Sequence, residues 1–325
     1  MAVVLTILQR VAYAVALLAA VLVMNFSMIH LAPGDVADTI AAASGGADAE
    51  QMAEIRADYG LDQPFVVQLG RYMARVAMLD LGQSYFYNRP VVDLIAERLP
   101  ATLLLVVSAQ VLALALGTAM GVFAAKNPKG VLSYVVTFFA LFGYAAPVFW
   151  TGILLLIAFS LKIPLFPVAG MMDVTLDAGP IRRAVDVAHH LVLPMVTLAS
   201  IFLALYSRLC RASMLEVLGS DYVRTARAKG LSAREVTVKH ALKNALPPVV
   251  TLAGLQFSAV ISGAVLVETV YSWPGLGQLA LTAILSRDTP TILGILFFSA
   301  LVVVVGNLAT DAVLRAIDPR LRGRA

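Results

Sequence analysis

A run of basic side chains occupies the polar interval 221–248, between two strongly apolar segments. Six lysines and arginines there accompany one acidic residue inside the interval, Glu235, and another, Asp221, at its first position. Positive charge concentrated in this way attracts either anionic lipid headgroups or a docking protein. The chemistry that the interval offers is therefore electrostatic binding. Its basic residues are Arg224, Arg227, Lys229, Arg234, Lys239 and Lys243.

Helix start and stop signals divide this interval into two short helices. Asp221 can cap the first helix, and Gly230 is placed to end it, because a positive φ costs glycine little. Ser232 and Glu235 have the capping-box spacing that begins the second helix. The two prolines at 247–248 disfavour further helix. The interval is therefore predicted to form a helical hairpin.

Other chemistry finds little support in the sequence. There is no G-x-x-x-x-G-K-[ST] stretch to hold nucleotide phosphates, and no H-E-x-x-H, paired cysteine or G-x-S-x-G motif. His189 and His190 are adjacent, so on a helix their side chains point about 100° apart and not toward one metal. No catalytic residue, metal site or cofactor site is predicted.

Two polar residues lie in or near apolar segments and are candidates for a pore or gate. Glu268 is an ionisable group at the end of an apolar segment, where it is costly unless it faces water or a partner. It can also fix a loop at the membrane surface through a hydrogen bond. Asn25 can line a polar path or bond to a neighbouring helix. Both alternatives stay open for each residue.

Composition places the chain among polytopic membrane proteins. Of its 325 residues, 60% are hydrophobic and 14% are charged, and the mean hydropathy is +0.86. These values exclude an ordinary soluble domain. The single cysteine, Cys210, excludes an intrachain disulfide framework.

Six apolar intervals are long enough to cross about 30 Å of hydrocarbon. Six crossings put both chain ends on one side, and the basic residues of the short loops and of the hairpin place that side in the cytoplasm. The third interval contains Gly143 and Pro147 and is predicted to be one long, kinked helix. The fourth interval carries Pro194 near its start. Tyr271 and Trp273, at and just after the end of the fifth interval, suit the aromatic belt at the level of the lipid headgroups. The intervals are 11–29, 101–124, 131–161, 191–206, 249–271 and 292–314.

The interval 31–100 is predicted to lie outside and to contain two helices, 49–59, which Gly60 can end, and 64–77. These helices either pack on the spans or contact another protein outside the membrane. In the second span, Gly117 and Gly121 have the spacing that permits close helix approach, inside the chain or with a second membrane protein.

The hairpin resembles the cytoplasmic EAA loop of bacterial ABC-importer permeases, in its dipeptide, oligopeptide and nickel branch. The stretch 225–230, Thr-Ala-Arg-Ala-Lys-Gly, matches the small-residue core and glycine of that loop, and His240, Asn244, Ala245 and Pro248 match its tail. The eponymous glutamate is absent, since Arg224 and Thr225 stand where the motif opens. The outer interval and the stretch 268–277 resemble the B-type permease of the same branch.

The resemblance implies an all-α, six-helix membrane protein of the cytoplasmic membrane, with residues 1–30 as the first span, 31–100 as an extracytoplasmic helical segment and 101–325 as the permease core. It implies a non-enzymatic subunit that pairs with a C-type permease, two ATPases that use ATP and Mg, and a solute-binding protein. The second hairpin helix is marked by Ser232, Glu235, His240 and Asn244. The ATPase-docking helix is expected to use Tyr222, Val223, Arg224, Thr225, Ala226, Arg227, Ala228, Lys229 and Gly230.

Three other functions make different demands on the sequence. The same branch contains permeases for nickel chelates and other small solutes. A gradient-driven secondary transporter needs ionisable groups deep in several spans, and this chain has few, near the span ends. An intramembrane enzyme needs a nucleophile with a base, or metal ligands, at matching depth, and neither is found.

Overall fold

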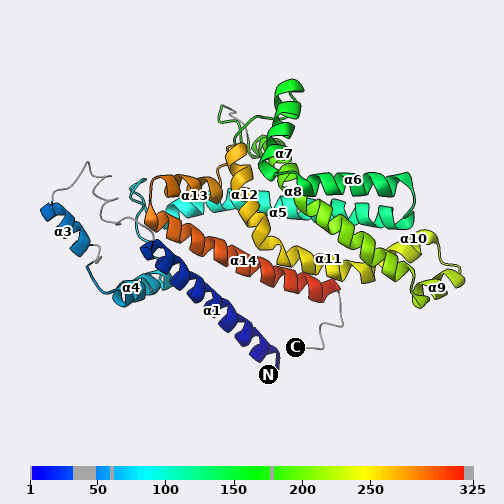
Figure 1. Ribbon diagram of the computed structural model, residues 1–325, viewed down its shortest axis with the longest axis horizontal. Coiled ribbons are helices and arrows are strands. Elements are labelled where there is room, and N and C mark those ends of the chain that lie inside the picture. The colour runs from blue at the N-terminus through cyan, green and yellow to red at the C-terminus, as the bar shows by residue number, and fades with distance from the viewer. Residues whose placement is uncertain (1, 32–48, 59–61, 176–178, 318–325) are drawn as a thin grey trace. The chain divides into compact units, whose positions relative to one another are not determined.

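The computed structural model describes residues 2–31, 49–58, 62–175 and 179–317. Over these ranges the chain is built of helices, with one isolated bridge between Gln83 and Pro90 (Figure 1). It forms two compact units. Unit 1 comprises Met1–Pro100 and Gly275–Val304, and unit 2 comprises Ala101–Pro274 and Val305–Ala325. The all-α prediction is therefore confirmed for the described residues.

Unit 1 is organised around an amphipathic helix, α4. Leu69, Tyr72 and Val76 recur at helical spacing and pack into the core of the unit. The rings of Tyr72 and Phe26 stack with their centroids 5.1 Å apart, which joins α4 to α1. The helices that contribute to unit 1 are α1 (Ala2–Leu31), α3 (Ala49–Asp58), α4 (Phe65–Ala77), α13 (Leu276–Leu285) and the first parts of α5 (Val91–Lys126) and α14 (Thr289–Ile317).

Both helices expected in the interval 31–100 are present as α3 and α4. Pro64 immediately precedes α4, as its position in the sequence suggested. Gly60, the expected end of the first helix, lies outside the described residues. The helix α13 was not predicted, because its ten residues are too few for a span and it follows no capping side chain.

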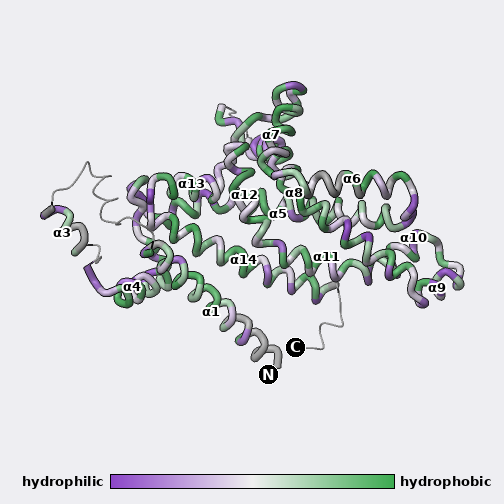
Figure 2. Tube along the Cα trace, in the orientation of Figure 1, coloured by the Kyte–Doolittle hydropathy of each residue, from purple (hydrophilic) through white to green (hydrophobic). Residues whose placement is uncertain are grey.

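Unit 2 packs its helices around the long helix α8, and Figure 2 shows the apolar residues that run along α6 and α8. Its core contains Leu105, Leu198, Tyr206, Val249 and Trp273, all fully buried. Its elements, besides the later parts of α5 and α14, are α6 (Val131–Ala145), α7 (Val148–Leu156), the π-helix η1 (Ile157–Lys162), α8 (Pro180–Leu218), α9 (Asp221–Ala228), α10 (Ala233–Glu235), the π-helix η2 (Val236–Leu242), α11 (Lys243–Leu255) and α12 (Phe257–Val270).

Two glycines let α5 and α8 approach closely. A Cβ atom on Gly121 would lie 2.6 Å from Cβ of Cys210 and 2.7 Å from the carbonyl oxygen of Ser207, and one on Gly117 would lie 3.0 Å from Cβ of Tyr206. Of the two uses foreseen for this glycine pair, the structure shows packing inside the chain.

Length and composition make three of the described helices candidates to cross a membrane: α5, α8 and α14. The pair α11 and α12 qualifies as a fourth if it is one span, bent by 55° at Gln256. Shorter apolar helices occupy Ala12–Met28 within α1, Val148–Lys162, and α13. The described residues thus provide three or four spans by this measure, against the six that the sequence predicted.

Three expectations about prolines are wrong. The third apolar interval is two helices, because the chain leaves the helix at residues 146–147, and a residue before proline avoids the α region. Pro194 lies well inside α8, since that helix begins at Pro180. Pro247 and Pro248 lie inside α11, where the preceding π-helix η2 already interrupts the regular hydrogen-bond ladder.

The expected placement of Trp273 and Tyr271 in a headgroup belt is also wrong. Trp273 is fully buried and donates its Nε1–H to the carbonyl oxygen of Ala101 at 2.9 Å. Tyr271 is 2% exposed and its hydroxyl contacts the hydroxyl of Thr197 at 2.9 Å and donates to the carbonyl oxygen of Gly152 at 3.0 Å. Both polar ends are satisfied inside unit 2, so the rings need no headgroup contact.

Candidate functional site

The first hairpin helix, α9, lies between two turns that the sequence determines. Its N-cap is Ser220 and not Asp221, which is the first helical residue and forms an exposed 3.4 Å ion pair with Arg224. The helix ends before Gly230, whose φ is +80° and whose N–H donates to the carbonyl oxygen of Arg227 at 3.0 Å. The glycine prediction is confirmed, and the Asp221 cap is wrong.

The second hairpin helix begins with the predicted capping box. The Ser232 hydroxyl accepts from the N–H of Glu235 at 3.3 Å, and the Glu235 carboxylate accepts from the N–H of Ser232 at 3.4 Å. The hydrogen bond from the Ser232 side chain, with smaller help from nearby Lys239, holds the pKa of the exposed Glu235 carboxyl below its usual value. From this start the chain remains helical through α10, η2 and α11.

A small apolar core fastens α9 to the rest of the hairpin. Val223 is fully buried and Ala226 is 6% exposed, and both pack with Val236 of η2. Val217 and Leu218, at the end of α8, pack against the same cluster. Their spacing along α9 places Val223 and Ala226 on one face of the helix, and that face is turned inward. Two residues expected on the docking surface are thus covered by the chain itself.

A polar contact joins the two hairpin helices on another side. The Asn244 side-chain amide donates to the hydroxyl of Tyr222 at 3.0 Å and to the carbonyl oxygen of His240 at 2.9 Å. Three residues singled out in the sequence for different reasons therefore meet in one contact. Tyr222 keeps 45% of its surface exposed.

The exposed residues of α9 include Arg224 and Arg227, and Figure 2 shows hydrophilic residues along the hairpin at α9 and α10. The hairpin's other marked ion pair, between Lys239 and Glu235, spans 3.2 Å and is exposed. Exposed pairs of this kind contribute little to stability, so most of the positive charge remains available to a partner. The remaining exposed residues from this part of the prediction are Arg224, Thr225, Arg227, Ala228, Lys229 and Gly230.

Two long helices connect the hairpin to the apolar body of unit 2. The helix α8 is continuous from Pro180 to Leu218, so its apolar middle and the C-terminal part that leads to the hairpin form one unbroken helix. On the other side, the helical run from Ala233 reaches Leu255 before the chain bends. The packed core at Val223 therefore ties α9 to both helices at once. Sequence reasoning missed Val217 and Leu218, which precede the polar interval, and Val236, although its apolar character inside that interval is visible.

The two pore or gate candidates lie in different units. Glu268 is fully buried in α12 and accepts a hydrogen bond from the Thr102 hydroxyl at 2.6 Å. The N–H of Trp273 also donates to the backbone carbonyl of Glu268 at 2.8 Å. Asn25 is half-buried in α1. The Glu268 contacts match the loop-fixing alternative that the sequence left open, although at a buried position.

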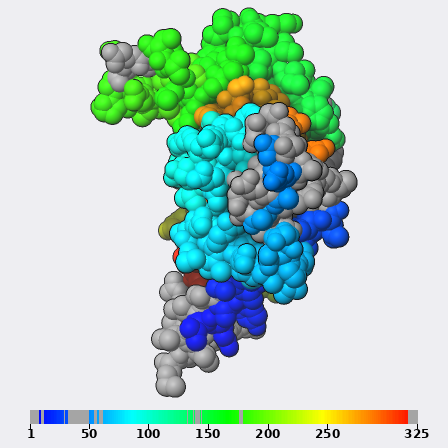
Figure 3. Space-filling model, turned by 90° about the vertical axis from the view of Figure 1, so that its left-hand side faces the viewer, coloured from blue at the N-terminus to red at the C-terminus, as the bar shows by residue number. Residues whose placement is uncertain are grey.

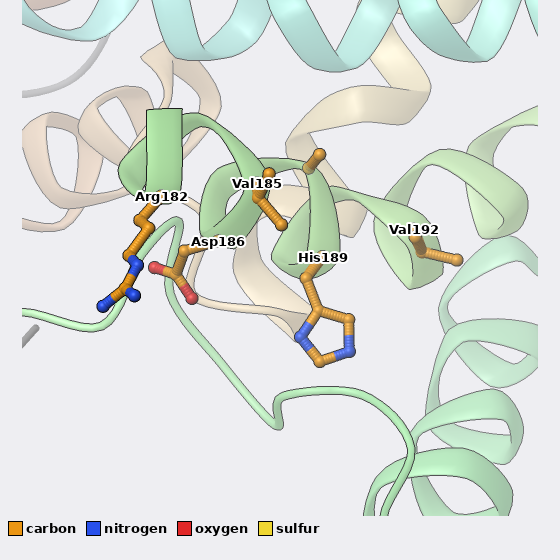
Figure 4. Close-up of a pocket in the computed structure, with 6 residues that line it drawn as sticks. Arg182, Val185, Asp186, His189 and Val192 are labelled. Atoms are coloured by element: carbon orange, nitrogen blue, oxygen red, sulfur yellow. The ribbon is translucent and has the colours of Figure 1, made fainter. Parts of the chain in front are cut away.

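A shallow hollow on the first turns of α8 offers little for catalysis. Figure 4 shows Arg182, Asp186 and His189 projecting to one side of this helix. His189 bonds to the carbonyl oxygen of Leu165 at 2.7 Å, and Nδ1 of His190 lies 3.3 Å from the carboxylate of Asp186. Among the described residues, no group of three or more histidine, cysteine or acidic side chains is arranged to hold a metal ion.

Comparison with known proteins matches nearly the whole chain to one family. Residues 3–106 match the N-terminal component, and residues 117–323 the inner membrane component, of binding-protein-dependent transport systems. The chain is 37% identical over 317 residues to the oligopeptide transport system permease protein AppB of Bacillus subtilis, covering 97% of this chain and 98% of that protein. It is 36% identical over 333 residues to the dipeptide transport system permease protein DppB of Escherichia coli K12, with the same coverage.

A solved structure shares the fold. An inward-facing form of the MetNI methionine ABC transporter matches with a TM-score of 0.53 and 16% identity, over 69% of this chain and 96% of that chain. The two relatives that match along nearly their whole length and the two family matches indicate the same family. The chain therefore belongs to the binding-protein-dependent transport system inner membrane component family, the permease subunits of ABC importers.

Proposed function

We propose that this permease subunit carries oligopeptides or dipeptides across the cytoplasmic membrane. The support is the similarity over 97% of the chain to permeases named for those substrates. The subunit is an integral membrane component and not an enzyme, because a separate ATPase hydrolyses ATP in this family. Nickel chelates are the alternative cargo within the same branch, and an uptake assay separates the two.

The proposed topology has six crossings with both termini in the cytoplasm. Residues 1–30 form the first span, 31–100 an extracytoplasmic helical segment, and 101–325 the five-span core. The support is the six apolar intervals of the sequence and the basic residues of the short loops, which favour the inner side. The hairpin 221–248 is then cytoplasmic.

The hairpin is proposed to dock on the ATPase through the exposed side of α9. Tyr222, Arg224, Arg227 and Lys229 offer an aromatic ring and three positive charges there. The observation that carries this proposal is the buried cluster of Val223, which packs α9 against the end of α8 and against η2. A displacement of α9 by the bound ATPase would be transmitted to α8 through Leu218 and to α11 through η2.

Such a docking site drives transport only if it binds differently in the two states of the ATPase pair. A contact of equal affinity in both states shifts no equilibrium. In the proposed cycle, ATP and Mg bind the two partner ATPases, their closure moves the seated α9 helices together, and the passage opens toward a loaded solute-binding protein. A homologous C-type permease supplies the other half of the passage.

Co-purification tests the docking. Arg227→Glu reverses one charge on the exposed side of α9, and we expect it to reduce recovery of the ATPase about tenfold. Arg234→Glu is the matched control, because that residue is also exposed in the hairpin but lies on the second helix. Equal loss in both variants would point to general charge attraction and not to α9. Full recovery in both would contradict the docking proposal.

The substrate is tested by uptake in vesicles that contain the complete importer. We expect labelled di- or tripeptide to accumulate with ATP and solute-binding protein present, and not with a proton gradient alone. Accumulation of a nickel chelate without peptide uptake would assign the other cargo. Uptake that needs only the gradient would contradict an ABC importer.

A further inference from the structure

Unit 1 contains a hollow of about 750 Å³ that the transport cycle described above does not use. Its wall is formed by α4, by the end of α1, by the stretch 80–85 that follows α4, and by the first two turns of α14. The face of unit 1 that Figure 3 shows has α4 and the start of α5 at its surface. Aromatic and aliphatic side chains line one part of the hollow, including Phe26, Tyr72 and Leu293.

Positive charge gathers at the rim of this hollow. Arg71 and Arg75, one helical turn apart on α4, both line it and are both exposed. Neither has an ion-pair partner within 4.0 Å among the described residues. Asp80 also lines the hollow, and its Oδ1 already accepts from the N–H of Gly82 at 3.0 Å. Two guanidiniums therefore face one carboxylate, and the excess charge suits an oxyanion.

A buried donor lies at the same place. Tyr72 is 8% exposed, and its hydroxyl has no hydrogen-bond partner in the part of the chain that the structure describes. Burial raises the pKa of this hydroxyl to about 12, against a smaller opposing effect of Arg75, so it stays protonated. A buried hydroxyl left without a partner costs free energy, and a ligand oxygen in the hollow would satisfy it.

The surroundings of the hollow are apolar and uncovered. Phe65 at the start of α4 is 41% exposed, and its ring centroid lies 5.6 Å from that of Phe26, which lines the hollow. Leu79, next to Asp80 in the chain, is 58% exposed. An amphipathic helix that carries basic residues on one side and exposed apolar residues on another suits the boundary between headgroups and acyl chains. These neighbours favour a lipid over a free peptide, whose carboxylate would come without acyl chains to cover them.

We propose that this hollow binds the phosphate of an anionic phospholipid of the outer leaflet, with Arg71 and Arg75 on the phosphate oxygens and the acyl chains along α1 and α4. The inference rests on the proposed topology, in which α4 lies outside. A lipid held there would fix α4 against α1, beside the stacked rings of Phe26 and Tyr72.

Native mass spectrometry of the complete importer tests this, with dioleoylphosphatidylglycerol as the probe and dioleoylphosphatidylcholine as the zwitterionic comparison. We expect each guanidinium removed in the R71Q/R75Q variant to lower the affinity for the anionic lipid about tenfold. Tyr72→Phe keeps the ring and should weaken binding several-fold. The matched control is R182Q/R183Q, which removes two exposed charges from α8 and should leave binding unchanged.

Three results would overturn the proposal. One is binding of phosphatidylglycerol by R71Q/R75Q as tightly as by the unaltered chain. Another is equal binding of the two lipids. A third is stoichiometric displacement of the lipid by a tripeptide, which would assign the hollow to a substrate carboxylate. Peptide-stimulated ATP hydrolysis by the same preparation reports the proposed transport function separately. If peptide does not stimulate hydrolysis but the anionic lipid still binds, the result counts against the peptide-transport function and not against the lipid site.

Discussion

Gly230 is the residue at which one substitution should separate ATP hydrolysis from transport. Its φ of +80° turns the chain from α9 into the second hairpin helix. Proline needs a φ near −65°, about 145° away, and has no N–H. Gly230→Pro therefore cannot keep this turn, and it loses the hydrogen bond to the carbonyl oxygen of Arg227.

The size of the effect can be worked out from the turn. The lost hydrogen bond contributes about 1 kcal/mol, and the forced change of φ disrupts a turn that holds the cluster of Val223 in place. Together we expect at least about 3 kcal/mol against the native hairpin. Gly230→Ala should cost only about 1 to 2 kcal/mol, because nothing lies within 4 Å of its Cβ and the penalty is the left-handed backbone alone.

The assay is the ratio of peptide imported to ATP hydrolysed by importers in lipid vesicles. Gly230→Pro should lower this ratio strongly while the chain still inserts, and Gly230→Ala should lower it less. Gly219→Ala is the matched control, since Gly219 ends α8 with a φ of −80° and its added Cβ would make ordinary contacts. Import by Gly230→Pro at the normal rate would refute this account of the turn.

Three further substitutions, two of them with a comparison variant, test the packing by thermal unfolding in detergent. Thr102→Val removes the hydroxyl that donates to Glu268 and should cost about 1 to 3 kcal/mol, whereas Thr102→Ser should cost less; equal melting of the two would show that the hydrogen bond does not matter. Gly121→Ala should destabilise the α5–α8 contact by about 1 to 3 kcal/mol, because its Cβ would lie 2.6 Å from a side-chain carbon. Gly70 lies on α4 with open space around it, so Gly70→Ala should be neutral or stabilising. A larger loss of stability in Gly70→Ala than in Gly121→Ala would contradict the close-packing argument. Asp288→Ala should cost about 3 kcal/mol, since this buried carboxylate accepts from two hydroxyls and a backbone N–H; unchanged stability would mean that water replaces it.

Local chemistry explains why much of the hairpin could be predicted. The capping box at Ser232 and the left-handed turn at Gly230 depend on residues a few positions apart, and both formed as expected. The sequence signals that predicted α3 and α4 are also local. Close packing of α5 on α8 at Gly121 was one of two foreseen alternatives.

What the sequence could not show depends on contacts between distant residues. Val223 and Ala226 were expected on the docking surface because the resemblance assigns that surface to the first hairpin helix. The structure turns them inward because Val236 and Leu218 come to the same place. The spacing of Val223 and Ala226 marks one apolar face of the helix, but it does not say whether the chain itself or a partner covers that face.

The buried carboxylate of Asp288 was missed for the same reason. It accepts from the hydroxyls of Ser84 and Thr291 and from the N–H of Tyr85 at 3.1 Å. The Asp288–Ser84 pair is separated by 204 positions in the chain. Trp273 likewise looked like a headgroup residue until its partner, the carbonyl of Ala101, was known.

Accessibility of the hairpin tests the central claim most directly. Cys210 is the chain's single cysteine and is buried, so Lys229→Cys introduces one reactive thiol on the exposed side of the hairpin. We predict that a bifunctional maleimide–succinimide ester reagent links this thiol to a lysine of the partner ATPase in inverted membrane vesicles. A membrane-impermeant maleimide added to intact cells should not reach the thiol. Labelling from outside intact cells would place the hairpin on the wrong side of the membrane and contradict the account.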